Sequence, residues 1–415
     1  MRNGFTNVDS KISLGLERIE RVLDSSGNPQ KGFYSVLVGG TNGKGSVAHL
    51  LARFMMEKGE GVGLYTSPHL LRVSERVVIN GREVPEEVLD RLVRRVGLFS
   101  RETGVELTPF EGFTAAAFLA FAEAGVRWVI AEVGMGGRLD ATNLLHASLS
   151  VITNVALDHS QWLGTSLSQV AREKAGIIKT GRPVVLGELP NGALETVLET
   201  ASERGAPVHR YGREYFVRVT DFSSQGVKFS YYSDKIPEGV ENLRLSSLGE
   251  HFAVNASIAL RALEVLGEDV GEWVRGVLER FSLPGRGQVV RLSKGVRILD
   301  VAHNPAGMEA LCRGVASLLR DRPLFLFSLL RDKEWREMGE LLCRWFGRES
   351  LLFVSLPCEE RVLEPSLVES KLGVSTCGEG RLGEILLGHR GTVVVCGCFA
   401  LVRRALEILR EAGVD

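Results

Sequence analysis

The chain has 415 residues, 44% of them hydrophobic, and 50 Lys and Arg side chains stand against 51 Asp and Glu for a net charge of −1. This length predicts two or three domains with apolar cores. The balanced charge excludes an overall attraction to nucleic acid or membranes, so we expect neither as a partner.

The N-terminus lacks the apolar core of a signal peptide, and the most apolar predicted helix, at 113–126, is too short to span a bilayer. None of the six cysteines forms a CxxC pair, which predicts reduced thiols. Cys396 and Cys398 alternate along a predicted strand and should face the same side. These features together predict a cytoplasmic protein.

A predicted amphipathic helix at 8–24 precedes the first strong signal, which runs from Phe33 to Lys58. An apolar strand pattern there leads through GTNGKGS, residues 40–46, into a helical pattern. The glycines allow backbone N–H groups to point inward, Lys44 supplies a charge for phosphates, and Ser46 supplies a hydroxyl for magnesium. A plain strand-to-helix turn would need no lysine.

The spacing differs from the common P-loop, because Gly45 separates Lys44 from Ser46 and Val38 stands where a glycine is usual. A GTPase or a transport ATPase is therefore disfavoured.

Between 61 and 124, a short strand ends at Tyr65, a loop carries Ser67 and His69, and a charged helix is predicted over 86–103. His69 alone would be a surface or capping histidine. Thr108, Phe110 and Glu111 precede an apolar helix, where capping and packing are the ordinary roles.

Residues 128–143, WVIAEVGMGGRLDATN, predict a strand with Glu132 at its carboxyl end, where ligands gather in a parallel sheet. A lone acidic residue there is usually a helix cap, but beside a P-loop a magnesium ligand is favoured. In the next block, at 149–179, His159 alone is a weak magnesium ligand. Lys174 alone would be a surface lysine paired with Glu173.

The remaining chain continues the α/β pattern. A helix at 249–267 begins near Asn255, which could be structural or face a nucleotide. The proline and glycines in the stretch from Leu283 to Gly287 predict a break in the structure. We expect a hinge at 284–287, between a first domain at 1–283 and a second domain at 288–415. Asp300 and His303 follow a strand of that second domain, whose further strands are predicted at 323–330, 350–356 and 392–398.

Four blocks in this order, GTNGKGS, EVGMGGRLDATN, LDHSQWLG with EKAGIIK, and LDVAHNP, resemble the folylpolyglutamate and dihydrofolate synthases of the Mur-ligase superfamily. The resemblance covers essentially 8–410. It implies an α/β fold: a P-loop ATPase domain with a mostly parallel sheet and a smaller Rossmann-like C-terminal domain that binds glutamate.

The activity implied is an ATP-dependent ligase that adds L-glutamate to dihydropteroate or to the γ-carboxylate of reduced folates through an acyl phosphate. The cofactors implied are ATP, Mg²⁺ at two sites, and CO₂ as a carbamate on Lys174. The family further implies a monomer.

The resemblance also assigns site residues. The catalytic residues are Lys44, Glu132, His159 and carbamylated Lys174, and the metal ligands are Ser46, Glu132, His159 and Lys174. The ATP-binding residues are Gly40, Thr41, Asn42, Gly43, Lys44, Gly45, Ser46, Asn255, Arg286, Asp300 and His303. The substrate-binding residues are Leu14, Gly15, Leu16, Ser67, His69, Thr108, Phe110, Glu111, Leu139, Asp140 and Ala141.

Two positions depart from the family. Gly287 replaces an aromatic residue after Arg286, which predicts a looser hinge, and Cys398 replaces a serine. Two alternatives remain. A UDP-muramyl peptide ligase would need an N-terminal domain for which the early P-loop leaves no room, and a nucleotide-switch protein would bind ATP without ligation.

Overall fold

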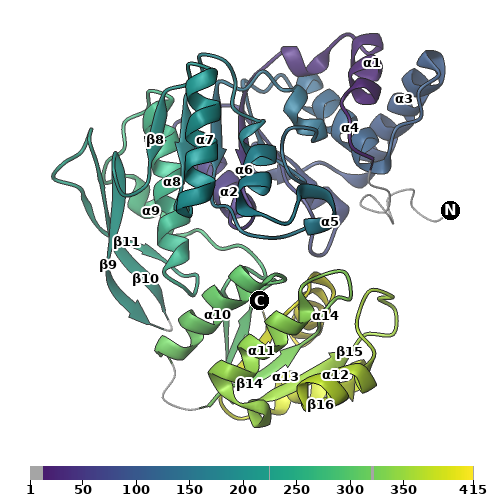
Figure 1. The fold of residues 1–415 in the computed structure, drawn as a ribbon, viewed down its shortest axis with the longest axis vertical. Coiled ribbons are helices and arrows are strands. Elements are labelled where there is room, and N and C mark those ends of the chain that lie inside the picture. The colour runs from purple at the N-terminus through teal and green to yellow at the C-terminus, as the bar shows by residue number, and fades with distance from the viewer. Residues whose placement is uncertain (1–12, 224, 319–321, 415) are drawn as a thin grey trace. The chain divides into compact units, whose positions relative to one another are not determined.

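The computed structural model describes residues 13–223, 225–318 and 322–414. Its contacts divide the chain into two compact units (Figure 1). The first unit comprises 1–216, 232–239 and 255–277, and the second comprises 217–231, 240–254 and 278–415. The predicted hinge at 284–287 stays a prediction.

An eight-stranded sheet forms the centre of the first unit, in the order β4-β3-β2-β5-β1-β6-β7-β8. Its strands are β1 Tyr34–Gly39, β2 Val62–Tyr65, β3 Val77–Ile79, β4 Arg82–Glu83, β5 Trp128–Glu132, β6 Leu149–Ile152, β7 Val184–Leu186 and β8 Val208–Arg210. All pairings are parallel except those of β3 with β2 and β4. The central strands β1 and β6 are mostly apolar and are buried apart from Tyr34, as expected of parallel strands that are covered on both faces.

The helices that lie wholly or mostly in the first unit are α1 Glu17–Ser25, α2 Lys44–Glu57, α3 Glu86–Thr103, α4 Pro109–Glu123, α5 Ser160–Leu163, α6 Leu167–Ala175, α7 Asn191–Glu203, α8 His251–Val265 and α9 Val274–Glu279. α2 packs on β1, β2 and β5, α3 packs on α4, and α6 packs on α7. The apolar stretch predicted as a buried helix is α4, which is buried along most of its length.

A three-stranded antiparallel sheet comes between α7 and α8 in the chain. It consists of β9 Tyr215–Ser223, β10 Gly226–Ser233 and β11 Val240–Leu245. The sequence predicted only a continuation of the α/β pattern there and not a separate sheet.

The second unit contains a six-stranded sheet in the order β12-β13-β17-β14-β15-β16, parallel apart from the β12–β13 pair. Its strands are β12 Gln288–Leu292, β13 Gly295–Leu299, β14 Leu324–Phe327, β15 Leu351–Ser355, β16 Ser375–Gly378 and β17 Val393–Cys396. The helices are α10 Pro305–Leu318, α11 Trp335–Phe346, α12 Pro365–Leu372, α13 Leu382–Gly388 and α14 Phe399–Glu411. The chain is therefore α/β with mostly parallel sheets, as predicted.

Two local predictions are wrong. Residues 13–16 are not helical, so the helix predicted at 8–24 begins only at Glu17; the first part of that prediction lies outside the described residues. β17 ends at Cys396, so Cys398 does not share its strand but precedes α14.

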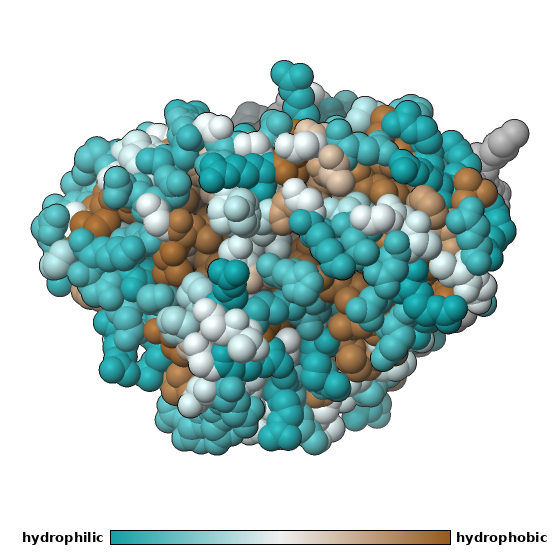
Figure 2. Space-filling view, turned by 90° about the horizontal axis from the view of Figure 1, so that it is seen from above, coloured by the Kyte–Doolittle hydropathy of each residue, from teal (hydrophilic) through white to brown (hydrophobic). Residues whose placement is uncertain are grey.

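Apolar residues are interspersed among hydrophilic ones on the face shown in Figure 2. Within the part of the chain that the structure describes, no helix is long and apolar enough to cross a bilayer.

Candidate active site

The P-loop leaves the carboxyl end of β1 and enters α2. Gly40 and Gly43 have φ of 140° and 80°, a region that glycine adopts without strain. A Cβ on Gly40 would collide with Thr153, and one on Gly43 would lie 2.5 Å from the side-chain oxygen of Asn255. Both glycines are therefore required by close approach as well as by conformation.

The loop is tied to the segment that follows β6. Asn154 Oδ1 accepts hydrogen bonds from the amides of Thr41, at 3.2 Å, and Asn42, at 2.9 Å. Thr153 Oγ1 donates to the Asn42 carbonyl at 2.6 Å, and the Thr41 hydroxyl exchanges hydrogen bonds with the backbone of Ala156. These contacts fix the loop before any ligand binds, which lowers the entropy cost of binding.

The first turn of α2 carries the two side chains predicted to serve phosphate and metal. Lys44 Nζ donates to the Thr41 carbonyl at 3.2 Å, and Ser46 is buried. Backbone N–H groups at a helix N-terminus favour an anion, and the lysine adds a full charge.

Glu132 lies beside this turn, because β5 and β1 are parallel neighbours that end together. A Cβ on Gly45 would lie 3.3 Å from Glu132 Oε2, and the same oxygen accepts a hydrogen bond from the Ser67 amide at 3.0 Å. The carboxylate therefore lies at the start of α2 and is held from the loop after β2.

The donors at this point suit magnesium. No group of three or more His, Cys, Asp or Glu side chains in the described residues is arranged to hold a metal ion. Magnesium beside a nucleotide needs only one or two protein oxygens, since phosphate and water complete its shell. The Ser46 hydroxyl and the Glu132 carboxylate fit that requirement.

Lys174 lies in the last turn of α6 and is only 3% exposed. Burial, together with repulsion from Lys44, lowers its pKa to about 7, against the attraction of Asp158. Glu173 instead forms a 2.9 Å ion pair with Arg138. The alternative of a surface lysine paired with Glu173 is therefore excluded.

His159 follows Asp158 at the turn before α5. It has a φ of 51°, and its amide donates to Asp158 Oδ1 at 2.8 Å. Its partly exposed ring lies 3.8 Å from the same oxygen. The Asp158 carboxylate and the His159 imidazole therefore follow directly after the segment 153–156, which binds the P-loop.

Several predicted substrate residues have structural partners. Thr108 and Glu111 form a capping box at α4, and Glu111 also forms a 2.9 Å ion pair with Arg18. A Cβ on Gly134 would lie 2.5 Å from the Phe110 ring, which therefore packs on that loop.

The other predicted substrate residues differ in their contacts and exposure. Asp140 accepts hydrogen bonds from Met135 and Thr142, and burial raises its pKa. His69 Nδ1 accepts from buried Arg76 at 2.9 Å. Four more predicted residues are Ala141, which is buried, Leu139 and Leu16, which are half-buried, and Leu14, which is exposed. Gly15, with a φ of 136°, lies beside the Glu17 side chain.

Arg286, Asp300 and His303 gather within the second unit. Asp300 accepts hydrogen bonds from the amides of Gly287, at 2.7 Å, and Ala302, at 2.8 Å. Burial raises the pKa of Asp300, and Arg286 opposes that rise. The Arg286 guanidinium lies over the Phe399 ring at 5.3 Å, and the His303 ring lies 5.6 Å from that ring.

The looser hinge expected at Gly287 stays a prediction, and the residue itself is closely packed. Its amide is bound to Asp300 and its carbonyl accepts from the Leu248 amide at 2.9 Å. A Cβ there would lie 2.6 Å from the Phe252 ring.

Sequence reasoning missed Asn154, Asp158 and Arg18 as members of these contacts. The signal that led to Glu132, a polar residue at the carboxyl end of a buried strand, also applies to Asn154, which lies two residues after β6. The ion pair of Arg18 with Glu111 joins residues 93 positions apart, so no local pattern indicates it.

The Mur ligase middle domain matches residues 38–263, which is more than half of the chain. The dihydrofolate synthase/folylpolyglutamate synthase of Escherichia coli strain K12 is 38% identical over 333 residues, 79% of this chain and 75% of that protein. The chain belongs to the folylpolyglutamate and dihydrofolate synthase family. The prediction of an ATP-dependent ligase is thereby confirmed.

Solved structures of this family agree with the fold. E. coli FolC in complex with DHPP and ADP has a TM-score of 0.86 and 33% identity, covering 98% of this chain and 96% of that one. A bifunctional folylpolyglutamate synthase/dihydrofolate synthase with Mn, AMPPNP and L-glutamate bound has a TM-score of 0.85 and 29% identity, covering 97% and 96%. Nucleotide and divalent metal thus bind to members of the family.

Proposed function

We propose that this chain joins L-glutamate to dihydropteroate, to reduced folates, or to both, at the expense of ATP. The observation that carries the proposal is the position of Glu132 beside the P-loop. Its carboxylate lies next to Gly45 at the start of α2, and one of its oxygens accepts a hydrogen bond from the Ser67 amide. The related E. coli protein bound to DHPP and ADP, and the bifunctional protein bound to L-glutamate, support the substrate classes.

The reaction has two steps. A carboxylate oxygen of the pterin-bearing substrate attacks the γ-phosphorus of ATP, the bond to the β-phosphate oxygen breaks, and an acyl phosphate and ADP form. The amine of glutamate then attacks the acyl carbon, loses a proton and expels phosphate. Lys44 reduces the repulsion between the two anions of the first step, since phosphoryl transfer depends chiefly on positioning and charge stabilisation.

Magnesium would be held by Ser46 and Glu132, with His159 as a further ligand, and would neutralise charge on the phosphates. A second ion requires an anion at Lys174. With a pKa of about 7 that amine is substantially unprotonated near neutral pH, which is the form that reacts with CO₂ to give a carbamate. The burial of Lys174 therefore supports the proposed modification.

The remaining assignments belong to the proposal. Asn255 contacts the nucleotide from its place beside Gly43. Leu157 and Trp162, exposed by 42% and 39% on either side of the Asp158–His159 turn, offer apolar surface for an aromatic substrate. The ATP roles of Arg286, Asp300 and His303 and the monomeric state rest on the resemblance alone, and the cytoplasmic location rests on the cysteine pattern of the sequence.

The test is phosphate release by the purified protein with ATP, Mg²⁺ and glutamate, with dihydropteroate or tetrahydrofolate added in parallel and products identified by mass. Turnover with both substrates is the result of a bifunctional synthase, and turnover with one identifies the activity. Absence of glutamate-dependent release with either substrate overturns the proposal.

Variants connect this activity to the site. Lys44→Ala and Glu132→Gln should each abolish amide formation. Glu132→Gln retains an acceptor for the Ser67 amide, so its melting temperature should stay near that of the wild type. Full activity in either variant would contradict the proposed site.

A further inference from the structure

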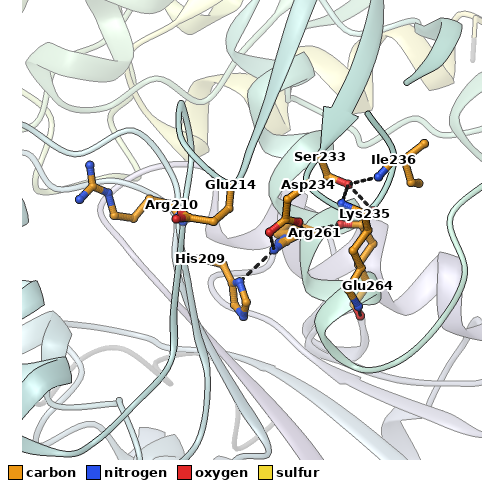
Figure 3. Close-up of polar contacts among 9 residues, drawn as sticks. All are labelled: His209, Arg210, Glu214, Ser233, Asp234, Lys235, Ile236, Arg261 and Glu264. Atoms are coloured by element: carbon orange, nitrogen blue, oxygen red, sulfur yellow. Dashed lines mark hydrogen bonds and ion pairs between the residues drawn. The ribbon is translucent and has the colours of Figure 1, made fainter. Parts of the chain in front are cut away.

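Arg261 of α8 is a charged side chain enclosed within the first unit, with 1% of it exposed. Its Nη1 lies 2.5 Å from Asp234 Oδ1 and 2.9 Å from Glu264 Oε2, and its Nη2 lies 2.9 Å from His209 Nδ1 (Figure 3). We call these four side chains the Arg261 node. A buried arginine is tolerated only where such partners surround it.

The partners come from three separate segments. His209 is the middle residue of β8, Asp234 directly follows β10, and Glu264 lies one turn after Arg261 on α8. Lys235 Nζ donates to the Glu264 carbonyl at 2.7 Å, and the Ser233 hydroxyl donates to Glu264 Oε1 at 2.8 Å. The node therefore fastens α8 to the last strand of the large sheet and to the end of β10.

The same helix reaches the P-loop. Asn255, Ile258 and Arg261 recur at three-residue spacing, which keeps them on one broad stripe of α8 over roughly 9 Å. A Cβ on Gly43 would lie 2.5 Å from Asn255, and one on Gly187, after β7, would lie 2.7 Å from Ile258. α8 thus meets the P-loop at one end of this stripe and the node at the other.

We propose that the Arg261 node is a positioning device that sets Asn255 against the P-loop and so determines nucleotide affinity. The inference rests on the nucleotide role proposed for Asn255. Hydrogen bonds have preferred directions, whereas apolar burial at the same place is non-directional and would allow the helix to shift along its axis. A shift of α8 would move Asn255 away from Gly43 without disturbing Lys44 or Glu132.

The test is the dissociation constant of ADP and of an ATP analogue, measured by calorimetry on the full chain. Arg261→Met, which keeps most of the side-chain volume, and Asn255→Ala should each weaken binding by about tenfold, whereas the double variant should be no weaker than either. With saturating ATP, kcat for Arg261→Met should stay within about twofold of the wild type. Unchanged affinity in Arg261→Met, or additive losses in the double variant, would overturn the inference.

A matched control separates positioning from loss of stability. Leu89→Ala removes a fully buried side chain of α3 and leaves a cavity in the core. It should lower the melting temperature with no change in nucleotide affinity. If Leu89→Ala weakens binding as much as Arg261→Met does, the effect is one of general stability and the inference fails.

A milder pair serves if Arg261→Met does not fold. His209→Gln keeps an acceptor for the guanidinium and should bind nucleotide as the wild type does, whereas His209→Leu removes that acceptor and should bind more weakly. Equal affinities in the two variants would contradict the inference. Because nucleotide binding needs neither glutamate nor folate, these results are independent of whether the proposed ligation occurs.

Discussion

The side-chain oxygen of Asn154 lies 2.9 Å from the amide nitrogen of Asn42 and ties the P-loop to the chain that leaves the neighbouring strand. The same oxygen accepts from Thr41. Two loop amides are therefore satisfied within the protein, and the first turn of α2 is left as the part of the loop that faces an anion.

Asn154→Ala should raise the KM for ATP about fivefold, because the Asn42 amide loses an acceptor worth about 1 kcal/mol, whereas the Thr41 amide keeps the Asn154 backbone carbonyl at 3.1 Å. Steady-state kinetics at saturating glutamate and folate check this. Asn154→Asp is the control: it keeps the acceptor and the melting temperature, but its charge repels the phosphates. If Asn154→Asp binds ATP as tightly as the wild type does, the proposed phosphate position is contradicted.

If Lys174 is carbamylated, the rate of ligation should increase with the concentration of CO₂. The Lys174 pKa of about 7 means that the reactive, unprotonated amine is lost as the pH falls below about 7. In CO₂-depleted buffer the rate should decline over that range, and bicarbonate should restore it. A pH profile that is identical with and without bicarbonate would count against the carbamate.

Lys174→Ala should be inactive and should recover part of its activity when short carboxylic acids are added, because they replace the missing anion. Lys174→Arg is the matched control, since its permanent cation leaves no room for such rescue. Equal behaviour of the two variants with added acid would oppose the proposed role.

Gly287→Ala should destabilise the second unit by about 2–4 kcal/mol, because strain at a φ of 58° is added to overlap with Phe252 and Leu248. Gly205→Ala is a close control, with the same φ and open space around it, and should cost only about 1 kcal/mol. Urea unfolding of both variants measures the difference. Equal losses would mean that close packing does not constrain Gly287.

The node should make stability pH-dependent through His209. Burial, followed by the charge of Arg261, lowers the pKa of His209, against the opposing effect of Asp234 and Glu214, while Lys235 adds to the lowering. Below the ordinary value of 6.5 the unfolded chain then binds more protons, so stability is present above that pH and is lost as the pH falls through the lowered pKa.

His209→Gln removes this titration and should show a shallower loss of stability between about pH 6.5 and more acidic conditions than the wild type. Thermal unfolding across that range checks it. Parallel curves for the two proteins would show that His209 does not change its protonation there.

The P-loop was predicted from a short stretch of chain, whereas the mostly parallel sheets were expected from the family resemblance, because the pairing of distant strands such as β1 and β5 has no local pattern. Glu132 was found from its position at the end of an apolar strand, and its approach to Gly45 follows from the parallel pairing of β5 with β1. The role of Lys174 was expected from the family resemblance, but its burial could not be predicted, since it depends on packing against distant segments.

Other contacts lacked any local pattern. Arg261 and His209 are 52 positions apart, and Asp234 lies 27 positions before Arg261. The hydrogen bond of Asp300 to the Gly287 amide likewise depends on how the turn at 284–287 meets the end of β13. These are consequences of tertiary structure, which charge and hydropathy patterns do not encode locally.

The eight-stranded sheet ends at both sides in very short strands. β4 has two residues, Arg82 and Glu83, both exposed and of opposite charge, and β8 has three, of which His209 is held by α8. An edge needs a run of unpaired backbone groups to recruit a strand from another molecule. Growth of this sheet by addition of a second copy at either of its edges is therefore disfavoured, even at the high concentrations that crystallisation requires.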